Sequence, residues 1–283
     1  MPFPTFRGIL REKLPQKEFE MLPSSFDVIG KIIVIELPGG LLKQRREIGK
    51  ALLEANRNAK TVCIEKTARR GRFRLQGFEI IAGRKSLETI HRESGCVFKL
   101  DIAKAFFSPR TATERMRIAE MVKPKEVVAV PFAGIGPYAI IIAKHAKPEF
   151  VYGIELNRNA TRYFRENIIL NKVQAKVEAI QGDARKVLAE KLRGKCDRVV
   201  MPLPMSSNLF LADAMLALKP KGGTIHVYAF GEKPEPFAKV ISKARSEAKK
   251  LGKTLRVKAK RIISTYSPTT VKVCADLLVG QKK

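Results

Sequence analysis

From about residue 126 onward, the chain alternates short β-branched runs with longer stretches in which apolar residues recur three and four positions apart. The short runs predict strands at 126–130, 150–155, 175–182, 197–201 and 223–230. The longer stretches predict helices at 137–146, 158–170, around 208–218 and at 235–251. This alternation predicts an α/β domain, a mostly parallel sheet with helices on both faces.

The last two predicted strands break this alternation. They cover residues 255–264 and 269–279, and only a short turn separates them. Because strands joined by a short turn pair antiparallel, we expect an antiparallel C-terminal hairpin that closes the sheet.

The first 100 residues have a different pattern, with a strand at 26–37, a helix near 41–55 and strands at 61–66 and 78–83. We expect a small α+β domain over residues 1–100 and the α/β domain over residues 101–283. Between two of these strands lies a basic loop that contains Arg69, Arg70, Arg72 and Arg74. This loop is either a solvated turn or a contact for phosphates and bases.

The charge balance indicates a polyanionic partner. Lys and Arg number 55 against 27 Asp and Glu, which gives a net charge of +28. The hydrophobic content of 45% is enough for a folded core, which argues against a disordered chain. Nucleic acid is the first candidate, because binding it releases condensed counterions, and an anionic membrane surface is the second. The third interpretation is a basic enzyme with a small substrate.

Neither a metal centre nor a membrane anchor is expected. The four cysteines lie far apart without a CxxC pair, and there are three histidines. The longest uncharged apolar stretch, residues 127–143, is shorter than a membrane span and is interrupted by Pro and Gly. Since the N-terminus has no secretory-signal pattern, we expect a cytoplasmic protein, and we expect it to be a monomer.

A glycine loop follows the first predicted strand of the α/β domain. Gly134 and Gly136 stand where a ligand approaches the backbone at the start of a helix. Glu155 ends the next strand, where a carboxylate accepts hydrogen bonds from ribose hydroxyls. Asp183 follows the third strand and is either an acceptor for an adenine amino group or a helix N-cap.

These positions favour S-adenosylmethionine over NAD as the cofactor. A dinucleotide loop has a third glycine, and here Ala139 stands in its place. Pro137 also lacks the N–H group that a pyrophosphate would bind. A glycine loop with one acid for ribose and one for adenine is the combination expected for S-adenosylmethionine.

Six segments, taken in order, resemble one known family: 101–115, 132–137, 154–157, 182–185, 197–204 and 222–230. Over about residues 26–279 the chain resembles the archaeal and eukaryotic tRNA guanine-N1 methyltransferases that act at position 37, next to the anticodon. The resemblance implies a Rossmann-like class I methyltransferase fold without a trefoil knot, and the anticodon arm of tRNA as partner. It adds Phe132 and Pro204 to the expected cofactor contacts.

The resemblance also implies the catalytic residues. It places Arg74 at the guanine O6 and makes Glu114 the base. This assignment is chemically sensible, because N1 loses its proton as it attacks the methyl carbon and negative charge spreads toward O6. From the residues alone, Glu114 is equally an exposed side chain in a first helical turn, and Arg74 is equally a surface charge.

Two sets of residues are expected to contact tRNA. The resemblance implies Phe106, Arg110 and Arg115, and the basic loop adds Arg69, Arg70 and Arg72. Phe106 stands where the family has tyrosine, so it keeps the stacking surface and loses a hydroxyl group.

Two further departures keep other functions open. Val130 replaces a family acid at the end of the first strand, and residues 202–204 read Pro-Leu-Pro where the family reads Asn-Leu-Pro. One alternative is a wybutosine-pathway enzyme that transfers a methyl or aminocarboxypropyl group to the same nucleotide, although the proline-rich segment favours methyl transfer. The other is a tRNA-binding protein that has lost catalysis.

Overall fold

The computed structural model describes residues 5–66 and 75–281. The chain divides into two compact units, Met1–Arg110 and Thr111–Lys283. The sequence predicted the boundary near residue 100. The segment after that residue belongs to the first unit, where Ala105 is fully buried and its N–H group donates to the Asp101 carbonyl at 3.1 Å.

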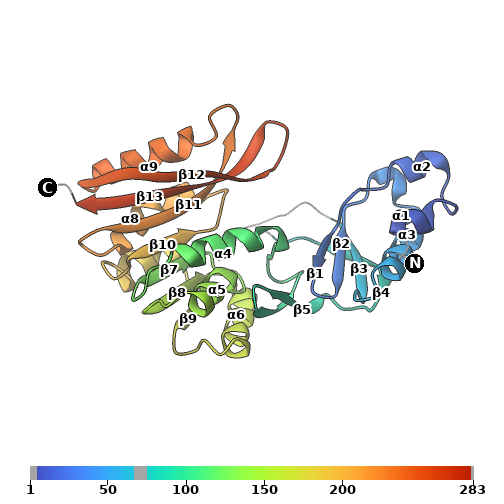
Figure 1. Cartoon of the computed structure of the whole chain (residues 1–283), viewed down its shortest axis with the longest axis horizontal. Coiled ribbons are helices and arrows are strands. Elements are labelled where there is room, and N and C mark those ends of the chain that lie inside the picture. The colour runs from blue at the N-terminus through green and yellow to red at the C-terminus, as the bar shows by residue number, and fades with distance from the viewer. Residues whose placement is uncertain (1–4, 67–74, 282–283) are drawn as a thin grey trace. The chain divides into compact units, whose positions relative to one another are not determined.

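The first unit contains a four-stranded sheet in the order β1-β2-β3-β4 (Figure 1). The strands are β1 (Asp27–Ile29), β2 (Ile32–Ile35), β3 (Thr61–Glu65) and β4 (Phe78–Gly83), with β2 and β3 parallel and the other neighbours antiparallel. The helical elements are α1 (Phe6–Leu10), α2 (Gln16–Glu20), η1 (Gly39–Leu41) and α3 (Arg45–Ala55). Leu10, Ile48 and Leu52 pack with Ile33 and Ile35 in its core, which confirms the expected small α+β domain.

Residues 26–37 form two strands, whereas the sequence predicted one. Gly30 has a φ of +58°, and a Cβ atom there would overlap the Ile90 carbonyl, so the chain reverses at a residue that must be glycine. Ile29 then pairs with Ile32 across the turn. Hydrophobic residues continue on both sides of this tight turn, and the pattern alone does not show it.

A hairpin of β5 (Glu88–Glu93) and β6 (Cys96–Asp101) completes the first unit. The sequence analysis did not predict it, because β5 is mostly polar. It supports the turn between β1 and β2, since the Gly30 N–H group donates to His91 Nδ1 at 3.1 Å and the Lys31 N–H group to Thr89 Oγ1 at 2.9 Å.

The second unit contains a seven-stranded sheet in the order β12-β13-β11-β10-β7-β8-β9. Its strands are β7 (Val127–Pro131), β8 (Phe150–Glu155), β9 (Val177–Gln181), β10 (Arg198–Met201), β11 (Gly223–Glu232), β12 (Lys253–Thr265) and β13 (Thr270–Gln281). The first five are parallel, and β13 pairs antiparallel with both β11 and β12. The predicted sheet and C-terminal hairpin are confirmed, and the hairpin's second strand is the one that joins the sheet.

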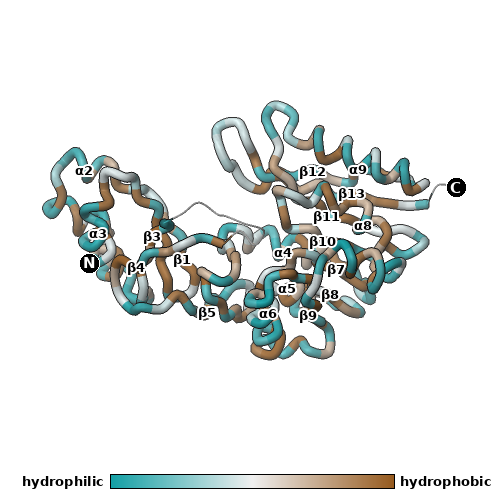
Figure 2. The backbone as a smooth tube through the Cα atoms, turned by 180° about the vertical axis from the view of Figure 1, so that it is seen from behind, coloured by the Kyte–Doolittle hydropathy of each residue, from teal (hydrophilic) through white to brown (hydrophobic). Residues whose placement is uncertain are grey.

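Helices cover both faces of this sheet. One layer contains α4 (Ala112–Met121), α5 (Pro137–His145) and α6 (Arg158–Leu170), preceded by η2 (Pro109–Thr111). The other contains α7 (Ala184–Lys186), the π-helical turn η3 (Val187–Lys191), η4 (Ser207–Phe210), α8 (Leu211–Ala217) and α9 (Ala238–Lys250). Figure 2 shows hydrophobic colour along the inner strands, and β10 is buried throughout.

The parallel strands β7, β8, β9 and β10 are neighbours, so the loops that follow them meet at one edge of the sheet. Ligands of open α/β sheets bind at this edge. In the described part of the chain, no helix has the length and apolar character needed to cross a membrane.

Candidate active site

The loop after β7 has the backbone of a close-approach ligand loop. Phe132, Gly134 and Gly136 all have left-handed φ angles of 60°, 58° and 90°. Gly136 is the N-cap of α5, and a Cβ atom there would overlap the Phe164 ring. Since glycine alone fits at Gly136 without strain, the loop backbone stays open at the start of the helix.

Glu155, at the end of β8, holds this loop in place. The Gly134 N–H group donates to Glu155 Oε2 at 2.8 Å, and the Asn157 N–H group donates to Oε1 at 2.8 Å. Burial raises the pKa of the Glu155 carboxyl, and the backbone donors oppose this shift. Each oxygen keeps acceptor capacity for a ribose hydroxyl, because a carboxylate oxygen accepts more than one hydrogen bond.

Asp183 caps the short helix α7, where its side chain accepts the Arg185 N–H group at 2.9 Å. This is one of the two roles expected from the sequence. The adenine contact stays a prediction.

An aromatic pair lies at the same edge of the sheet. The rings of Phe132 and Phe210 meet edge to face with centroids 4.8 Å apart, and the Arg185 guanidinium lies 5.0 Å from the Phe210 ring centroid. Phe210 and Arg185 were not among the residues expected at the site. Their signals in the sequence are weak, since a lone phenylalanine or arginine is common.

A buried serine within the loop after β10 holds this loop in its conformation. The Ser207 hydroxyl lies within hydrogen-bonding distance of two carbonyls, those of Met201 at 3.0 Å and Leu203 at 2.7 Å, and Pro204 is buried. At this edge of the sheet, Glu155 supplies a polar acceptor, the glycine loop supplies an accessible backbone, and Phe132 and Phe210 supply an aromatic surface. These groups fit the ribose, the amino acid part and the adenine of S-adenosylmethionine.

Glu114 is buried in the first turn of α4, with 5% of its surface exposed. Arg117 donates two hydrogen bonds to this carboxylate, from Nη2 to Oε1 at 2.7 Å and from Nε to Oε2 at 2.8 Å. The Tyr228 hydroxyl donates to Oε1 at 2.6 Å. The exposed first-turn position that the residues alone allowed is therefore wrong.

A chain of buried charges continues from Arg117. Its Nη1 donates to Asp276 Oδ2 at 2.8 Å, and Asp276 Oδ1 lies 2.6 Å from His226 Nδ1. Arg198 Nη1 lies 2.6 Å from His226 Nε2, and Arg198 also binds Glu126. Because a guanidinium only donates, Nε2 accepts and the proton of a neutral His226 lies on Nδ1, where it bonds Asp276.

The pKa shifts in this cluster agree with that protonation. Burial lowers the pKa of His226, Asp276 opposes the shift, and Arg198 and Arg117 add to it. Burial raises the pKa of Asp276, but the hydrogen bonds from His226 and Arg117 and the positive charge of Arg117 outweigh burial and bring this pKa well below its usual range. Cys274, Asp276 and His226 lie close enough together to hold a metal ion. Two guanidinium groups beside them disfavour a cation there.

Arg115 was expected to contact tRNA, but its side chain is buried. It is 2% exposed, its Nη1 donates to the Thr111 hydroxyl at 2.7 Å, and its guanidinium lies 6.0 Å from the Tyr138 ring centroid. The reason is helical geometry, because positions 114 and 115 both lie on the buried side of α4.

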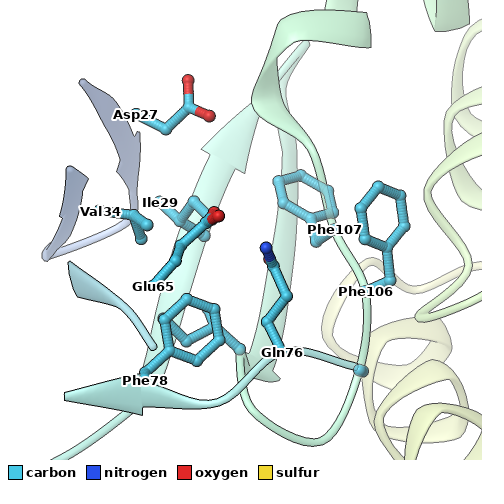
Figure 3. Close-up of a pocket in the computed structure, with 10 residues that line it drawn as sticks. Asp27, Ile29, Val34, Glu65, Gln76, Phe78, Phe106 and Phe107 are labelled. Carbon is cyan, nitrogen blue, oxygen red and sulfur yellow. The ribbon is translucent and has the colours of Figure 1, made fainter. Parts of the chain in front are cut away.

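A separate pocket lies in the first unit (Figure 3). Phe106 lines it together with Glu65, Gln76 and Phe78, and the Glu65 and Gln76 side chains point toward its centre. Its wall includes Asp27, whose carboxylate binds Arg110 Nε at 2.7 Å. Two of the expected tRNA-contacting residues, Phe106 and Arg110, are thus on or next to one pocket.

The remaining expected residues lie outside the described part of the chain. They are Arg69, Arg70, Arg72 and Arg74.

Comparison with known proteins identifies the family. A profile described as the TRM5/TYW2 methyltransferase domain matches residues 89–258, and one described as the TYW2 N-terminal domain matches residues 6–86. The tRNA (guanine(37)-N(1))-methyltransferase Trm5b of Pyrococcus abyssi is 41% identical, over 94% of this chain and 78% of the relative.

Two Methanocaldococcus jannaschii proteins widen the comparison. Its tRNA(Phe) (4-demethylwyosine(37)-C(7)) aminocarboxypropyltransferase is 37% identical over 77% of this chain and 85% of the relative. The crystal structure of its TYW2 in complex with AdoMet aligns with a TM-score of 0.72 and 29% identity, covering 91% of this chain and 100% of that one.

Proposed function

The chain belongs to the TRM5/TYW2 methyltransferase family, and we propose that it transfers the methyl group of S-adenosylmethionine to N1 of guanosine 37 in tRNA. The observation that carries this proposal is the 41% identity with a guanosine-37 N1 methyltransferase over 94% of the chain. The net charge of +28 supports it, because a basic enzyme suits a polyanionic substrate.

The crevice at the ends of β7, β8 and β10 is the cofactor site in this proposal. Glu155 accepts the ribose hydroxyls, and the backbone around Gly134 and Gly136 faces the amino acid part. Phe132 and the loop around Pro204 enclose the adenine. S-adenosylmethionine supplies a methyl group on a sulfonium, whose positive charge is lost when the methyl group leaves.

Glu114 takes the proton from guanine N1 as the new N–CH₃ bond forms and the S–CH₃ bond breaks. Its Oε1 already accepts from Arg117 and Tyr228, whereas Oε2 accepts only from Arg117 among the described residues. We therefore assign Oε2 as the proton acceptor, since it keeps a lone pair. Arg74 supports the negative charge that grows at guanine O6.

Two observations favour a second candidate, aminocarboxypropyl transfer to a tricyclic base at the same position. The first unit matches a profile named for TYW2, and an aminocarboxypropyltransferase is 37% identical. In that reaction a different carbon of the same sulfonium is transferred, so the cofactor crevice would be shared.

The experiment that separates these reactions uses the purified chain, S-adenosylmethionine labelled either in the methyl group or in the aminocarboxypropyl chain, and two tRNA substrates. One is an unmodified transcript with guanosine at position 37, and the other carries the tricyclic base at that position. Nucleoside mass analysis is expected to show N1-methylguanosine carrying the methyl label. A tRNA with adenosine at position 37 is the control and should stay unlabelled. Transfer of the aminocarboxypropyl label to the tricyclic base would support the second candidate, and binding of both tRNAs without transfer of either label would identify a binding protein.

The remaining sequence-based expectations concern the cell and the assembly. A cytoplasmic location, a monomeric state and the lack of a structural metal stay predictions.

A further inference from the structure

A groove runs between α9 and β12 in the second unit. It is lined by the 233–237 loop, by Ile241, Ser242 and Arg245 of α9, and by residues 257–260 and 262 of β12. Phe237, Ile241 and Val257 give it apolar surface. Neither the cofactor crevice nor the Glu114 cluster includes these residues.

The charges along the groove are mostly positive. Lys233, Arg245, Lys258 and Lys260 line it and are exposed, and Glu235 is the one carboxylate among its lining residues. In the part of the chain that the structure describes, Arg245, Lys258 and Lys260 form no ion pair with a carboxylate. Lys260 instead lies 5.8 Å from the Phe237 ring centroid.

Three other cations on α9 do have carboxylate partners. Lys239 pairs with Glu232 at 3.6 Å, and both Lys243 and Lys250 pair with Glu247, at 2.9 and 3.1 Å. Among the described residues, Arg245 and Lys249 of α9 have no carboxylate partner, and of these two Arg245 lines the groove.

Two basic residues of β12, Lys258 and Lys260, line the groove. Register shifts at Val257/Ala259 and Ile262/Ser264 leave Lys258 without a partner on β13, and residues 258–262 are all exposed. A bulge re-aims side chains. Lysines on an edge strand also prevent strand-to-strand aggregation, but that role does not explain Arg245, which lies on a helix across the groove.

The groove and the cofactor crevice open at the same edge of the sheet. The parallel strand β11 ends at Glu232, on the side where β7 and β8 end, and the 233–237 loop begins there. The Lys233 N–H group donates to the Thr269 carbonyl at 3.0 Å, which fixes this loop to the hairpin between β12 and β13. One end of the groove thus lies at the edge of the sheet that carries the expected cofactor loops.

We propose that this groove binds the sugar-phosphate backbone of the tRNA substrate, with Arg245, Lys258 and Lys260 on phosphates and Phe237 against sugars or bases. This inference rests on the proposed function and places part of the tRNA on the second unit. Cations that line a groove together with an aromatic ring are the usual features of a surface that holds an RNA strand.

The test compares two variants that remove equal charge. The groove variant is Arg245→Gln/Lys258→Gln/Lys260→Gln. The control variant is Lys123→Gln/Lys147→Gln/Lys195→Gln, whose exposed side chains precede β7, β8 and β10 at the opposite edge of the sheet. Affinity for unmodified tRNA transcript is measured over a range of salt concentrations, together with kcat, KM and S-adenosylmethionine affinity.

The groove variant should raise KM for tRNA by about tenfold or more over the control, with little change in kcat or in S-adenosylmethionine affinity. The slope of log K against log salt should flatten by about 0.7 to 0.9 for each phosphate that the variant no longer neutralises. Equal effects of the two variants would overturn the proposal. Binding of a polyglutamate peptide is measured with the same proteins. If the groove variant loses binding to this peptide and keeps its binding to tRNA, the groove holds an acidic polypeptide and the proposal is also overturned. If the wild-type chain neither binds nor methylates tRNA, the proposed function itself fails, which is a different result from a wild type that does both.

Discussion

The Tyr228 hydroxyl donates a hydrogen bond of 2.6 Å to Glu114 Oε1, which joins the centre of β11 to the first turn of α4. The carboxylate is thus held from two directions, since Arg117 binds it along the helix. A base held in one position has its free lone pair in one direction, which favours proton transfer from a well-placed substrate.

Replacing Glu114 with Gln should slow methyl transfer. The amide keeps the size of the side chain but cannot accept the N1 proton, so the single-turnover rate should fall by roughly 10² to 10⁴. Glu120→Gln is the matched control, because Glu120 is exposed on the same helix and should tolerate the change. Tyr228→Phe keeps the carboxylate and should slow the reaction less. A Glu114→Gln enzyme with the wild-type rate and pH profile would leave Glu114 a purely structural residue.

Arg74→Ala should also slow the chemical step, because the charge at O6 grows only as N1 loses its proton. If Arg74 and Glu114 act on the same transition state, the double variant should lose less than the sum of the two single losses. Single-turnover rates of the four proteins in this cycle measure the coupling. Additive losses would indicate that the two residues act independently.

Replacing Glu155 with Ala should weaken S-adenosylmethionine binding by about 1.5 to 3 kcal/mol, the usual contribution of hydrogen bonds to a charged group. Calorimetry on the folded variant measures this, with Glu149→Ala as the control, since Glu149 is exposed just before β8. Wild-type affinity in the Glu155 variant would mean that the cofactor lies elsewhere.

The pH dependence of cofactor binding follows from the same residue. Burial raises the pKa of Glu155, so the carboxylate becomes protonated at a higher pH than an exposed glutamate would. A protonated carboxyl accepts hydrogen bonds less well than a carboxylate. The affinity for S-adenosylmethionine should therefore decrease as the pH falls, and this decrease should begin at a higher pH than the titration of an exposed glutamate. The Glu155→Ala variant should lack this decline.

His226 should make the fold sensitive to acid. Burial lowers its pKa in the folded protein, so below about 6.5, the usual value, the unfolded chain binds a proton that the folded protein does not. The free energy of unfolding should therefore decrease as the pH falls from 7.5 to 5. Urea titrations should show a smaller decrease for His226→Gln, whereas His145→Gln, at an exposed position, should follow the wild type. Equal pH dependence in all three proteins would contradict a buried neutral His226.

The basic loop should contribute to tRNA binding. Changing Arg69, Arg70 and Arg72 to Gln should lower affinity for tRNA and flatten its salt dependence. The control removes the same charge from Arg11, Lys13 and Lys17, which are exposed in the same unit. If both triple variants weaken binding equally, the loop is a solvated basic turn whose charge acts only at long range.

The helices and strands of the second unit followed closely from the hydrophobic pattern. The predicted ranges 150–155 and 158–170 coincide with β8 and α6, because each has a clear period and a definite end. The first unit was harder to predict. Apolar residues lie on both sides of the turn at Gly30, and β5 has too few apolar residues to show a pattern.

The cofactor site was also partly visible in the sequence. Gly134 and Glu155 could be expected at adjacent strand ends, since parallel strands place their carboxyl ends at one edge. The hydrogen bond between them needed coordinates, as did the contact of Phe132 with Phe210.

The sequence by itself determined the element types, the parallel sheet with its glycine loop, and the large positive charge, because these depend on local periodicity and composition. Only the tertiary structure decided that Glu114 is buried and which groups surround it. Arg117 stands three residues along the same helix, which is a spacing that the sequence shows, whereas Tyr228 comes from β11 and Asp276, beyond Arg117, from β13. These two strands lie far from α4 along the chain and meet it only when the sheet has formed, so no spacing rule relates Tyr228 or Asp276 to Glu114.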